Sequence, residues 1–155
     1  MPTRLRDEIK QTRPFTSLEQ EALLSIERTA AVLGHSMAEA LKGYGITPTQ
    51  YNALRILRGA GEGGLCRNEV RERLVARVPD VTRLLDRLEE MGMVARERDT
   101  SDRRLVTTRI TRDGLKLLAR LDEPVAEAHQ RQLGHMDERS LRALIDLLAE
   151  ARGGG

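Results

Sequence analysis

The most constraining feature of this sequence is the stretch from Pro79 to Ile110, in which a helical pattern gives way directly to a strand pattern. Apolar residues first recur with the 3.6-residue period of an amphipathic helix whose apolar side would face a core. These residues are Val81, Leu84, Leu85, Leu88 and Met91. Gly92 follows, and a residue that tolerates positive φ is typical of a helix end. From Val94 the period becomes two, which predicts a short strand.

A second alternating run follows from Leu105 to Ile110. Only a short segment separates it from the first run, so the two are predicted to pair as the strands of a hairpin. Val106, Thr108 and Ile110 fall on one face of this strand. The residues that join the arms, 99–104, are polar and end in two arginines. A surface helix beside a basic hairpin is the arrangement of a winged helix on DNA.

The chain before this stretch begins with two predicted helices. Thr16 or Ser17 provides an N-cap, and one apolar stripe then continues to a stop at residues 43–45. The stripe consists of Leu23, Ile26, Ala30, Leu33, Met37 and Leu41. The segment TPTQ at 47–50 opens the second helix with proline at its first position and a capping box. Glycine-rich residues 59–64 end this helix, and a phosphate loop is disfavoured there because no strand precedes them.

A helix-turn-helix is predicted between the glycines and the hairpin. Leu65 begins a strand of one or two residues, and residues 68–75 form a short helix with Val70 and Leu74 turned inward. The tight connector at 76–78 leads straight into the amphipathic helix. Two short helices joined in this way, the second polar on its outward face, form the helix-turn-helix motif.

Two further helices, capped by Thr111 and Asp137, close the chain. Pro124 lies inside the first of them and should kink it. Their apolar stripes consist of Leu115, Leu118, Leu121, Val125 and Leu133, then Leu141, Leu144, Leu148 and Ala151. The predicted fold class is therefore mainly α with a small β-wing, a winged helix-turn-helix between long N- and C-terminal helices.

Composition excludes several classes of function. Only Phe15, Tyr44 and Tyr51 are aromatic among 155 residues, so the base-stacking platforms of RNA-recognition and single-strand-binding modules cannot be built. The net charge is only +2, but twelve arginines and nine acidic residues lie between residues 67 and 112. Basic charge thus gathers around the hairpin, where it suits nucleic acid or an anionic membrane surface equally.

Cysteine usage and hydropathy indicate a cytoplasmic protein. Cys66 is the only cysteine, which rules out an internal disulfide and fits a reducing compartment. No apolar run approaches the roughly 20 residues of a membrane span, and the arginine-rich N-terminus lacks the apolar region of a signal peptide. We therefore expect a cytoplasmic location and no membrane partner.

Two motifs carry a resemblance to a known family. They are VTRLLDRLEEMGMVARERDTSDRR at residues 81–104 and TRITRDG at residues 108–114. With them, residues from about 20 to 150 resemble the MarR (multiple antibiotic resistance regulator) family of bacterial transcription factors. In that family such segments read as a recognition helix, a wing whose loop ends in Asp-Arg-Arg, and Thr-x-x-Gly opening the next helix. The resemblance implies a homodimer that presents one winged helix to each half of a pseudo-palindromic DNA operator.

The expected organisation follows from these patterns. A flexible arm occupies residues 1–16, dimerisation helices occupy 17–45 and 111–152, and the winged helix-turn-helix occupies 46–110. The aliphatic stripes of the terminal helices exceed what one small winged-helix unit can cover, and a partner subunit would bury them. The alternative is a monomer in which these stripes pack against one another.

Candidate DNA contacts divide into base reading and positioning. Thr82 and Arg83 lie in the first turns of the recognition helix, where an arginine can pair with guanine in the major groove. Arg87, one turn later, suits a phosphate. Asp80 either accepts a hydrogen bond from cytosine or stabilises the helix N-terminus. Further positioning candidates are Arg67, Asn68 and Arg77.

In the wing, Arg103 and Arg104 are candidates for an adjacent minor groove, with Asp102 bracing one of them. Arg98, on the first wing strand, belongs to the same set. The alternative is that the arginines lie on a solvent-exposed face, where they form ion pairs with acidic residues at helical spacing. Those neighbours are Asp86, Glu89 and Glu90.

Other chemistry is weakly indicated. A thiol at a helix N-terminus can have a lowered pKa, but the oxidant-sensing cysteines of relatives typically lie in the first long helix, so Cys66 is interpreted as a small, partly buried residue. The three histidines, His35, His129 and His135, have no metal-ligand spacing. We expect no metal, no cofactor and no enzyme activity, since no nucleophile-base pair is recognisable.

The resemblance further implies a small effector, often phenolic or an aromatic carboxylate, bound between the dimer helices and the winged region. His35, Tyr51 and Arg55 are candidates, although Tyr51 is equally expected in the core and Arg55 on the surface. The predicted function is a sequence-specific, double-stranded DNA-binding regulator that acts as a ligand-responsive repressor. The alternative is a helical protein-interaction module whose winged helix no longer binds DNA.

Overall fold

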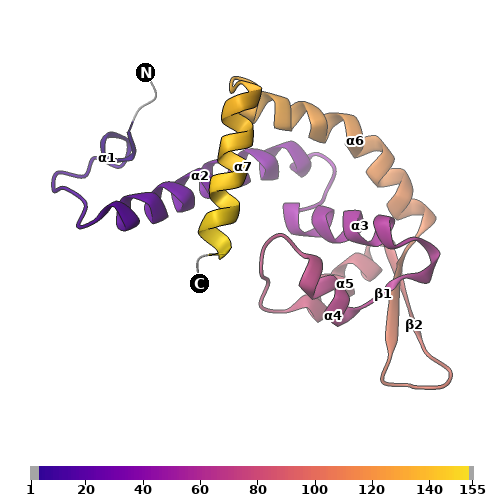
Figure 1. The fold of residues 1–155 in the computed structure, drawn as a ribbon. Helices are drawn as coiled ribbons and strands as arrows, with labels where there is room; N and C mark the ends of the chain where they lie inside the picture. Colours follow the sequence, from indigo (N-terminus) through magenta and orange to yellow (C-terminus); the bar gives the residue numbers. More distant parts are fainter. Residues whose placement is uncertain (1–3, 154–155) are drawn as a thin grey trace.

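A computed structural model describes residues 4–153, which form a mainly helical fold with one small antiparallel sheet (Figure 1). The long helices are α2 (Leu18–Lys42), α6 (Arg112–Leu133) and α7 (Glu138–Gly153). Between them in sequence come α3 (Pro48–Ala60), a single 3-10 turn (Gly61–Gly63), β1 (Leu65–Cys66), α4 (Arg67–Arg73), α5 (Val81–Glu90), β2 (Val94–Arg98) and β3 (Val106–Ile110). The predicted fold class is confirmed.

Side-chain caps start the helices where the sequence predicts them. The Ser17 hydroxyl accepts a hydrogen bond from the backbone N–H of Gln20 at the start of α2, at 3.1 Å. At α3, Thr47 and Gln50 form the complete capping box, with hydrogen bonds of 3.0 and 3.1 Å. Each cap satisfies N–H groups that a helix cannot pair internally.

Two glycines make the joint between α5, the sheet and α6. Gly92 has a φ of +76° directly after α5, a left-handed conformation that glycine adopts without steric cost. Gly114 lies so close to Met93 that a Cβ atom would collide with the Met93 carbonyl oxygen. The Thr111 hydroxyl accepts from the Gly114 N–H at 3.1 Å and donates to the Gly92 carbonyl at 2.7 Å. The Thr-x-x-Gly motif therefore fastens the start of α6 to the turn that ends α5.

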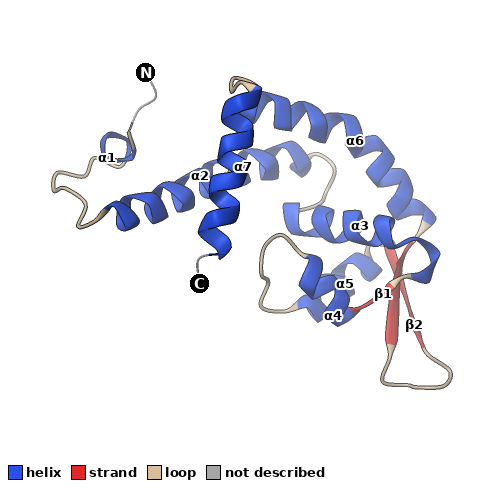
Figure 2. Cartoon of the chain, in the orientation of Figure 1, coloured by secondary structure: helices blue, strands red, loops and turns tan. Residues whose placement is uncertain are grey.

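In the sheet, β3 lies between β1 and β2 and is antiparallel to both. Val94 pairs with Ile110 at the base of the β2–β3 hairpin, and Arg98 pairs with Val106 at its far end. The hairpin extends away from the helices (Figure 2). Thr108, at the centre of β3, is 1% exposed, so the base of the wing belongs to the core.

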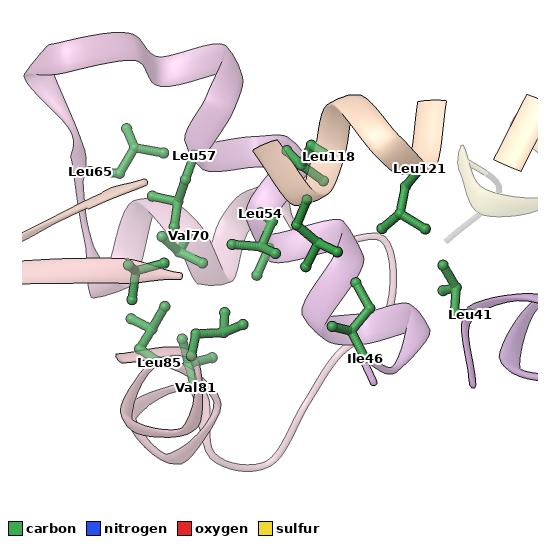
Figure 3. Close-up of a cluster of buried hydrophobic side chains, with 14 of the residues drawn as sticks. Leu41, Ile46, Leu54, Leu57, Leu65, Val70, Val81, Leu85, Leu118 and Leu121 are labelled. Atoms are coloured by element: carbon green, nitrogen blue, oxygen red, sulfur yellow. The ribbon is translucent and has the colours of Figure 1, made fainter. Parts of the chain in front are cut away.

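One aliphatic core joins α3, α5, α6 and the sheet (Figure 3). Leu54 and Leu57 of α3, Leu88 of α5 and Leu118 of α6 are fully buried. Complete burial of a leucine contributes roughly 1.5–3 kcal/mol relative to an exposed side chain. Helix α5 is therefore held by the main core of the protein and not by a satellite contact.

Three details differ from the sequence-based expectations. The helix predicted at 68–75 ends at Arg73, because Leu74 adopts extended backbone angles (φ −63°, ψ 135°). Met91 is 37% exposed, because α5 ends at the preceding residue and the chain turns away from the core. Leu115 is 43% exposed, and Leu117 lies in the core in its place, since the buried face of α6 includes Gly114.

The predicted N-terminal arm contains a one-turn helix, α1 (Leu5–Glu8). Leu5 is buried, and the Glu8 carboxylate lies 3.7 Å from the guanidinium of Arg28 in α2. Residues 1–3 lie outside the described residues, and flexibility of the arm stays a prediction. Pro124 lies inside α6, which continues through it as one helix and curves along its length in Figure 1. Nowhere in residues 4–153 is a helix both long and apolar enough to cross a bilayer.

Candidate nucleic-acid interface

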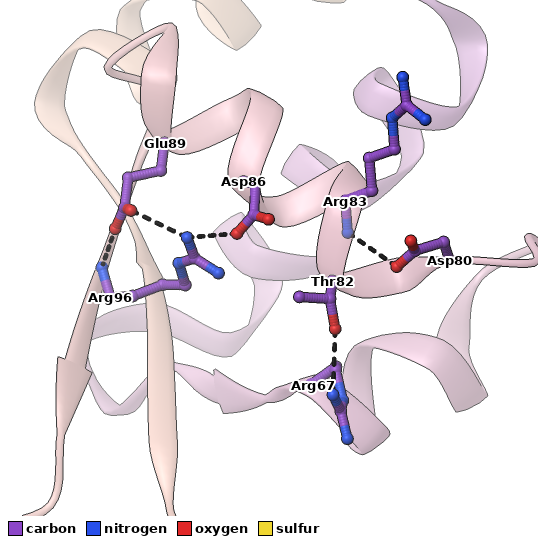
Figure 4. A network of polar contacts seen from close by, with 7 residues as sticks. All are labelled: Arg67, Asp80, Thr82, Arg83, Asp86, Glu89 and Arg96. Carbon is purple, nitrogen blue, oxygen red and sulfur yellow. Dashed lines mark hydrogen bonds and ion pairs between the residues drawn. The ribbon is translucent and has the colours of Figure 1, made fainter.

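The N-terminus of α5 is capped by Asp80. Its Oδ1 accepts a hydrogen bond from the backbone N–H of Arg83 at 2.9 Å (Figure 4). The sequence left two roles open for Asp80, a hydrogen bond to cytosine or stabilisation of the helix N-terminus. This hydrogen bond shows that Asp80 stabilises the helix N-terminus. The Arg83 side chain points away from this cap and is exposed.

Arg67 of α4 contacts the recognition helix. Its Nη1 donates to the Thr82 hydroxyl at 3.0 Å, so two candidate DNA contacts that are 15 residues apart in sequence lie side by side. Thr82 is half-buried, whereas Arg67 is exposed. The neighbouring Asn68 is exposed in the first turn of α4, and Arg77 is exposed in the turn that leads to α5.

A polar network joins the recognition helix to the wing (Figure 4). The guanidinium of Arg96 in β2 pairs with Asp86 and, at 2.9 Å, with Glu89, both on α5. The second oxygen of Glu89 accepts the backbone N–H of Arg96 at 3.2 Å. The Arg96 guanidinium holds the pKa of the Glu89 carboxyl below its usual value, and the pKa of Arg96 is raised in turn. These contacts fix the angle between helix and hairpin.

This network also affects whether the arginines on α5 have ion-pair partners. Because Arg96 engages Asp86 and Glu89, these carboxylates do not pair with Arg83 or Arg87 as the solvated-face alternative requires. Within residues 4–153, no carboxylate lies within ion-pair distance of Arg83 or Arg87. Two exposed cations on the outer face of α5 therefore remain available to an anionic partner. Sequence reasoning missed Arg96, since helical spacing does not show a partner from a strand.

The tip of the wing is shaped by aspartates. Asp99 Oδ1 accepts from the N–H and the hydroxyl of Ser101, at 2.8 and 2.7 Å, and these bonds lower the pKa of Asp99. Asp102 accepts the backbone N–H of Arg104 at 3.0 Å, so the predicted bracing acts on the backbone. Arg98 donates to the Arg103 carbonyl at 3.0 Å. Both arginine side chains of the tip, Arg103 and Arg104, are exposed.

A cavity of about 360 Å³ lies between the wing, the start of α4 and α5. Four arginines line it together with a few polar and apolar groups. The arginines are Arg67, Arg96, Arg98 and Arg104. Arg96 is paired with carboxylates of α5, whereas the other three have no ion-pair partner among the described residues. The concave junction between wing and helix is thus cationic, which suits the phosphates of a nucleic acid backbone.

Cys66 is the N-cap of α4 and is half-buried. Its backbone N–H donates to the Glu69 carboxylate at 2.8 Å, which lowers the pKa of Glu69. The expectation of a small, partly buried residue is confirmed. No group of three or more histidine, cysteine or acidic side chains gathers into a metal-ligand cluster within residues 4–153.

A second cavity, of about 400 Å³, lies between α3, the α4–α5 turn and α6. Tyr51 and Arg55 both line it, and Arg55 donates to the Tyr51 hydroxyl at 3.0 Å. His35 is exposed on α2 and does not line this cavity. Met37 and His129 line it instead, a placement that the sequence patterns did not indicate.

A helix-turn-helix with exposed cations on its second helix, flanked by an arginine-tipped hairpin, defines a winged helix-turn-helix protein. Residues 44–105 match the model of the MarR family. The transcriptional regulator TtmR of Methylorubrum extorquens is 32% identical, over 88% of this chain and 68% of its own length. The chain belongs to the MarR family of transcriptional regulators.

Solved structures agree with this assignment. A MarR transcription factor from Planctomyces limnophilus is 40% identical, with a TM-score of 0.69 over 88% of this chain and 98% of its own. Sco3205 of Streptomyces coelicolor, a MarR family regulator solved in complex with DNA, has a TM-score of 0.80 at 19% identity. That alignment covers 93% of this chain and 92% of the neighbour, and it shows that the two share the fold.

Proposed function

We propose that this protein is a sequence-specific, double-stranded DNA-binding repressor that acts as a homodimer in the cytoplasm. The observation that carries the proposal is the pair of exposed arginines on α5, Arg83 and Arg87. No carboxylate lies within ion-pair distance of either among residues 4–153, and Arg96 engages the neighbouring Asp86 and Glu89. A guanidinium on a helix seated in the major groove recognises guanine through O6 and N7. DNA in the complex with the related Sco3205 supports the same kind of partner.

Around this helix, the remaining candidates act on the DNA backbone. Arg67, Asn68 and Arg77 contact phosphates beside the major groove, and Arg103 and Arg104 enter the neighbouring minor groove. Arg98 and Asp102 hold the wing tip that carries those two arginines. Thr82 both faces the groove and orients Arg67.

Exposed apolar residues support the homodimer. Leu18, Leu23 and Val32 of α2 are more than half exposed, as are Ile145 and Leu147 of α7. A second copy of the chain would cover these side chains, because in a two-fold dimer the same surface of each subunit packs against the other. A two-fold dimer presents two recognition helices to two half-sites, so the operator is a pseudo-palindrome. A dimer seated on promoter DNA excludes polymerase, which is why we propose repression.

The test is a titration of fluorescent promoter DNA from upstream of its own gene with the purified protein, across a salt series. A DNA-binding regulator gives a preference for one fragment over scrambled duplex and an affinity that falls steeply with salt. Weak, salt-insensitive binding to every duplex would instead favour the protein-interaction module.

The cavity beside Tyr51 and Arg55 supports a ligand response. A tyrosine ring, a guanidinium and the apolar Met37 suit an aromatic carboxylate or a phenol. His35 stays a candidate only for a site completed by the second subunit. Benzoate and phenol are suitable probes, and a ligand-responsive repressor releases its promoter fragment as their concentration rises. Replacement of Arg55 by alanine should blunt the response to benzoate more than the response to phenol.

A further inference from the structure

The turn between α4 and α5, residues 74–80, sets the position of the recognition helix but is poorly bonded. Leu74 is already extended after α4, and the side chain of Val75 is 90% exposed. Residue 79 is proline and has no N–H. Among the described residues, only one backbone N–H of residues 75–78 has a hydrogen-bond partner. It is that of Val75, which donates to Oδ1 of Asn52 at 2.8 Å.

Asn52 is a firm anchor for this bond, because α3 is fixed in the core. The two residues that follow it, Ala53 and Leu54, are 0% exposed. The α3 helix is further held to α6 by Arg58, whose guanidinium makes two hydrogen bonds to Asp122, of 3.0 and 3.1 Å. A side chain whose helix is fixed by packing can hold the segment to which it bonds within about 0.5 Å of one position.

The other end of the turn leads directly into the DNA-facing helix. Asp80 is the last residue of the turn and caps α5 by accepting the N–H of Arg83. A displacement of Val75 is therefore passed within five residues to the helix N-terminus, where Thr82 and Arg83 lie. Core contacts hold the rear of α5 through Leu85 and Leu88, but the backbone N–H groups of residues 76–78 have no hydrogen-bond partner among the described residues.

Asn52 and Val75 also belong to the wall of the 400 Å³ cavity, together with Tyr51, Arg55 and Ala76. The same carboxamide is thus shared by the cavity and by the support of the recognition helix.

We propose that Asn52 is a positioning residue: its side-chain oxygen holds the α4–α5 turn, and through it the N-terminus of α5, in the pose that reads DNA. This inference rests on the proposed DNA-binding function. In this role Asn52 contacts the turn and not the DNA, so its removal acts on specificity through the placement of Arg83. The requirement is for a hydrogen-bond acceptor at this place, and not for the amide as such.

Three variants test this role. Asn52→Leu keeps the size of the side chain but removes the acceptor. Asn52→Asp keeps an acceptor oxygen and serves as the conservative rescue. Thr49→Ala truncates another residue of the same cavity wall that has no hydrogen bond to the turn, and it is the matched control. All three should fold, because none of these side chains lies in the aliphatic core. Loss of one hydrogen bond in Asn52→Leu should lower the melting temperature by only a few degrees.

The measurements are hydrogen exchange of the Val75 amide and the ratio of affinities for operator and scrambled duplex. In Asn52→Leu the Val75 amide should exchange faster, and the affinity ratio should fall about three- to tenfold, the range that follows from the net value of one hydrogen bond. Asn52→Asp and Thr49→Ala should match the wild type in both.

Unchanged exchange or an unchanged affinity ratio in Asn52→Leu would overturn the inference, and so would an Asn52→Asp variant that fails as the leucine variant does. A wild type without preference for any promoter fragment would sink the DNA-binding proposal itself. In that case hydrogen exchange would still test whether Asn52 holds the turn. Unchanged exchange of the Val75 amide in Asn52→Leu would refute that role.

Discussion

At the scale of single residues, the arginines fall into two groups according to what their guanidinium groups contact. Arg58, Arg96 and Arg109 each pair with a carboxylate of another element and hold the fold together. Arg83 and Arg103 are exposed and have no ion-pair partner within the described residues. The second group is the one in which a substitution should change DNA binding without changing stability.

Arg83 should determine specificity. Replacement of Arg83 by alanine would remove the proposed bidentate guanine contact. Such a contact is worth roughly 1–3 kcal/mol of discrimination, so operator affinity should fall about 5- to 150-fold. Affinity for scrambled duplex should change far less. The check is a titration of both duplexes. Equal affinities of variant and wild type for the operator would show that α5 reads no base through this residue.

Arg103 should contribute charge but little sequence information. A guanidinium in a minor groove responds mainly to groove width and negative potential. In Arg103→Ala, related sites should weaken together, and the slope of log affinity against log salt should decrease in magnitude by about one per subunit. The measurement is the same titration over a salt series. If the slope stays at its wild-type value, Arg103 does not touch the DNA.

At the scale of elements, helix α5, the proposed recognition helix, is held on two sides. Its apolar side, with Val81, Leu85 and Leu88, packs into the core. Its flank is held to β2 by the contacts of Arg96 with Asp86 and Glu89. These contacts join α5 to the wing on one side and to the core on the other, an arrangement that suits the proposed contact with two adjacent DNA grooves.

Loss of the Arg96 contacts should loosen this unit. Since partly exposed ion pairs are each worth about 0.2–1 kcal/mol, Arg96→Ala should cost roughly 1 kcal/mol and lower the melting temperature by about 2–4 °C. Arg71→Ala, an exposed arginine of α4, is the control and should leave stability unchanged. Calorimetry of both variants at pH 7 provides the comparison. A stability of Arg96→Ala equal to that of the control would contradict the role.

The same pair predicts a pH dependence. The folded pKa of Glu89 is lowered from 4.5, so its contribution to stability is fully present above that value and is lost as the pH falls through the folded pKa. The difference in melting temperature between wild type and Arg96→Ala should therefore shrink below about pH 4. A difference that stays constant from pH 7 to pH 3 would show that Glu89 and Arg96 do not interact.

At the scale of the whole molecule, one chain leaves its terminal helices incompletely covered. None of the side chains of α7 is fully buried, and its stripe of Leu141, Leu144 and Leu148 is only half-buried. Ile145 and Leu147 are 64% and 63% exposed. Exposed aliphatic side chains at such positions are typical of an interface between copies.

Charge placed on this surface should prevent dimerisation while sparing the chain's own core. In Ile145→Glu/Leu147→Glu, light scattering after gel filtration should give the mass of one 17.4 kDa chain, with operator binding weakened because only one half-site can be occupied. Ser140→Glu adds the same charge on a polar position of α7 and should remain a dimer. A dimeric, operator-binding double variant would place the interface elsewhere.

Local patterns determined most of the elements. Capping at Ser17, Thr47 and Thr111, the glycine after α5 and the change of period at Val94 all depend on contacts within a few residues. The helix-turn-helix, the hairpin and the fold class could be predicted for this reason. The buried side of α5 followed the 3.6-residue period, and only its last member, Met91, lies outside.

Contacts between distant segments could not be predicted, because periodicity describes one element at a time. The pairing of Arg96 with Glu89 depends on the angle between a strand and a helix, and the Asn52 anchor joins residues 23 positions apart. The burial of Leu117 in place of Leu115 depends on the close approach of Gly114 to Met93. The sequence therefore carried the chemistry of the candidate interface, whereas tertiary packing decided which arginines pair with carboxylates and which stay exposed without an ion-pair partner among the described residues.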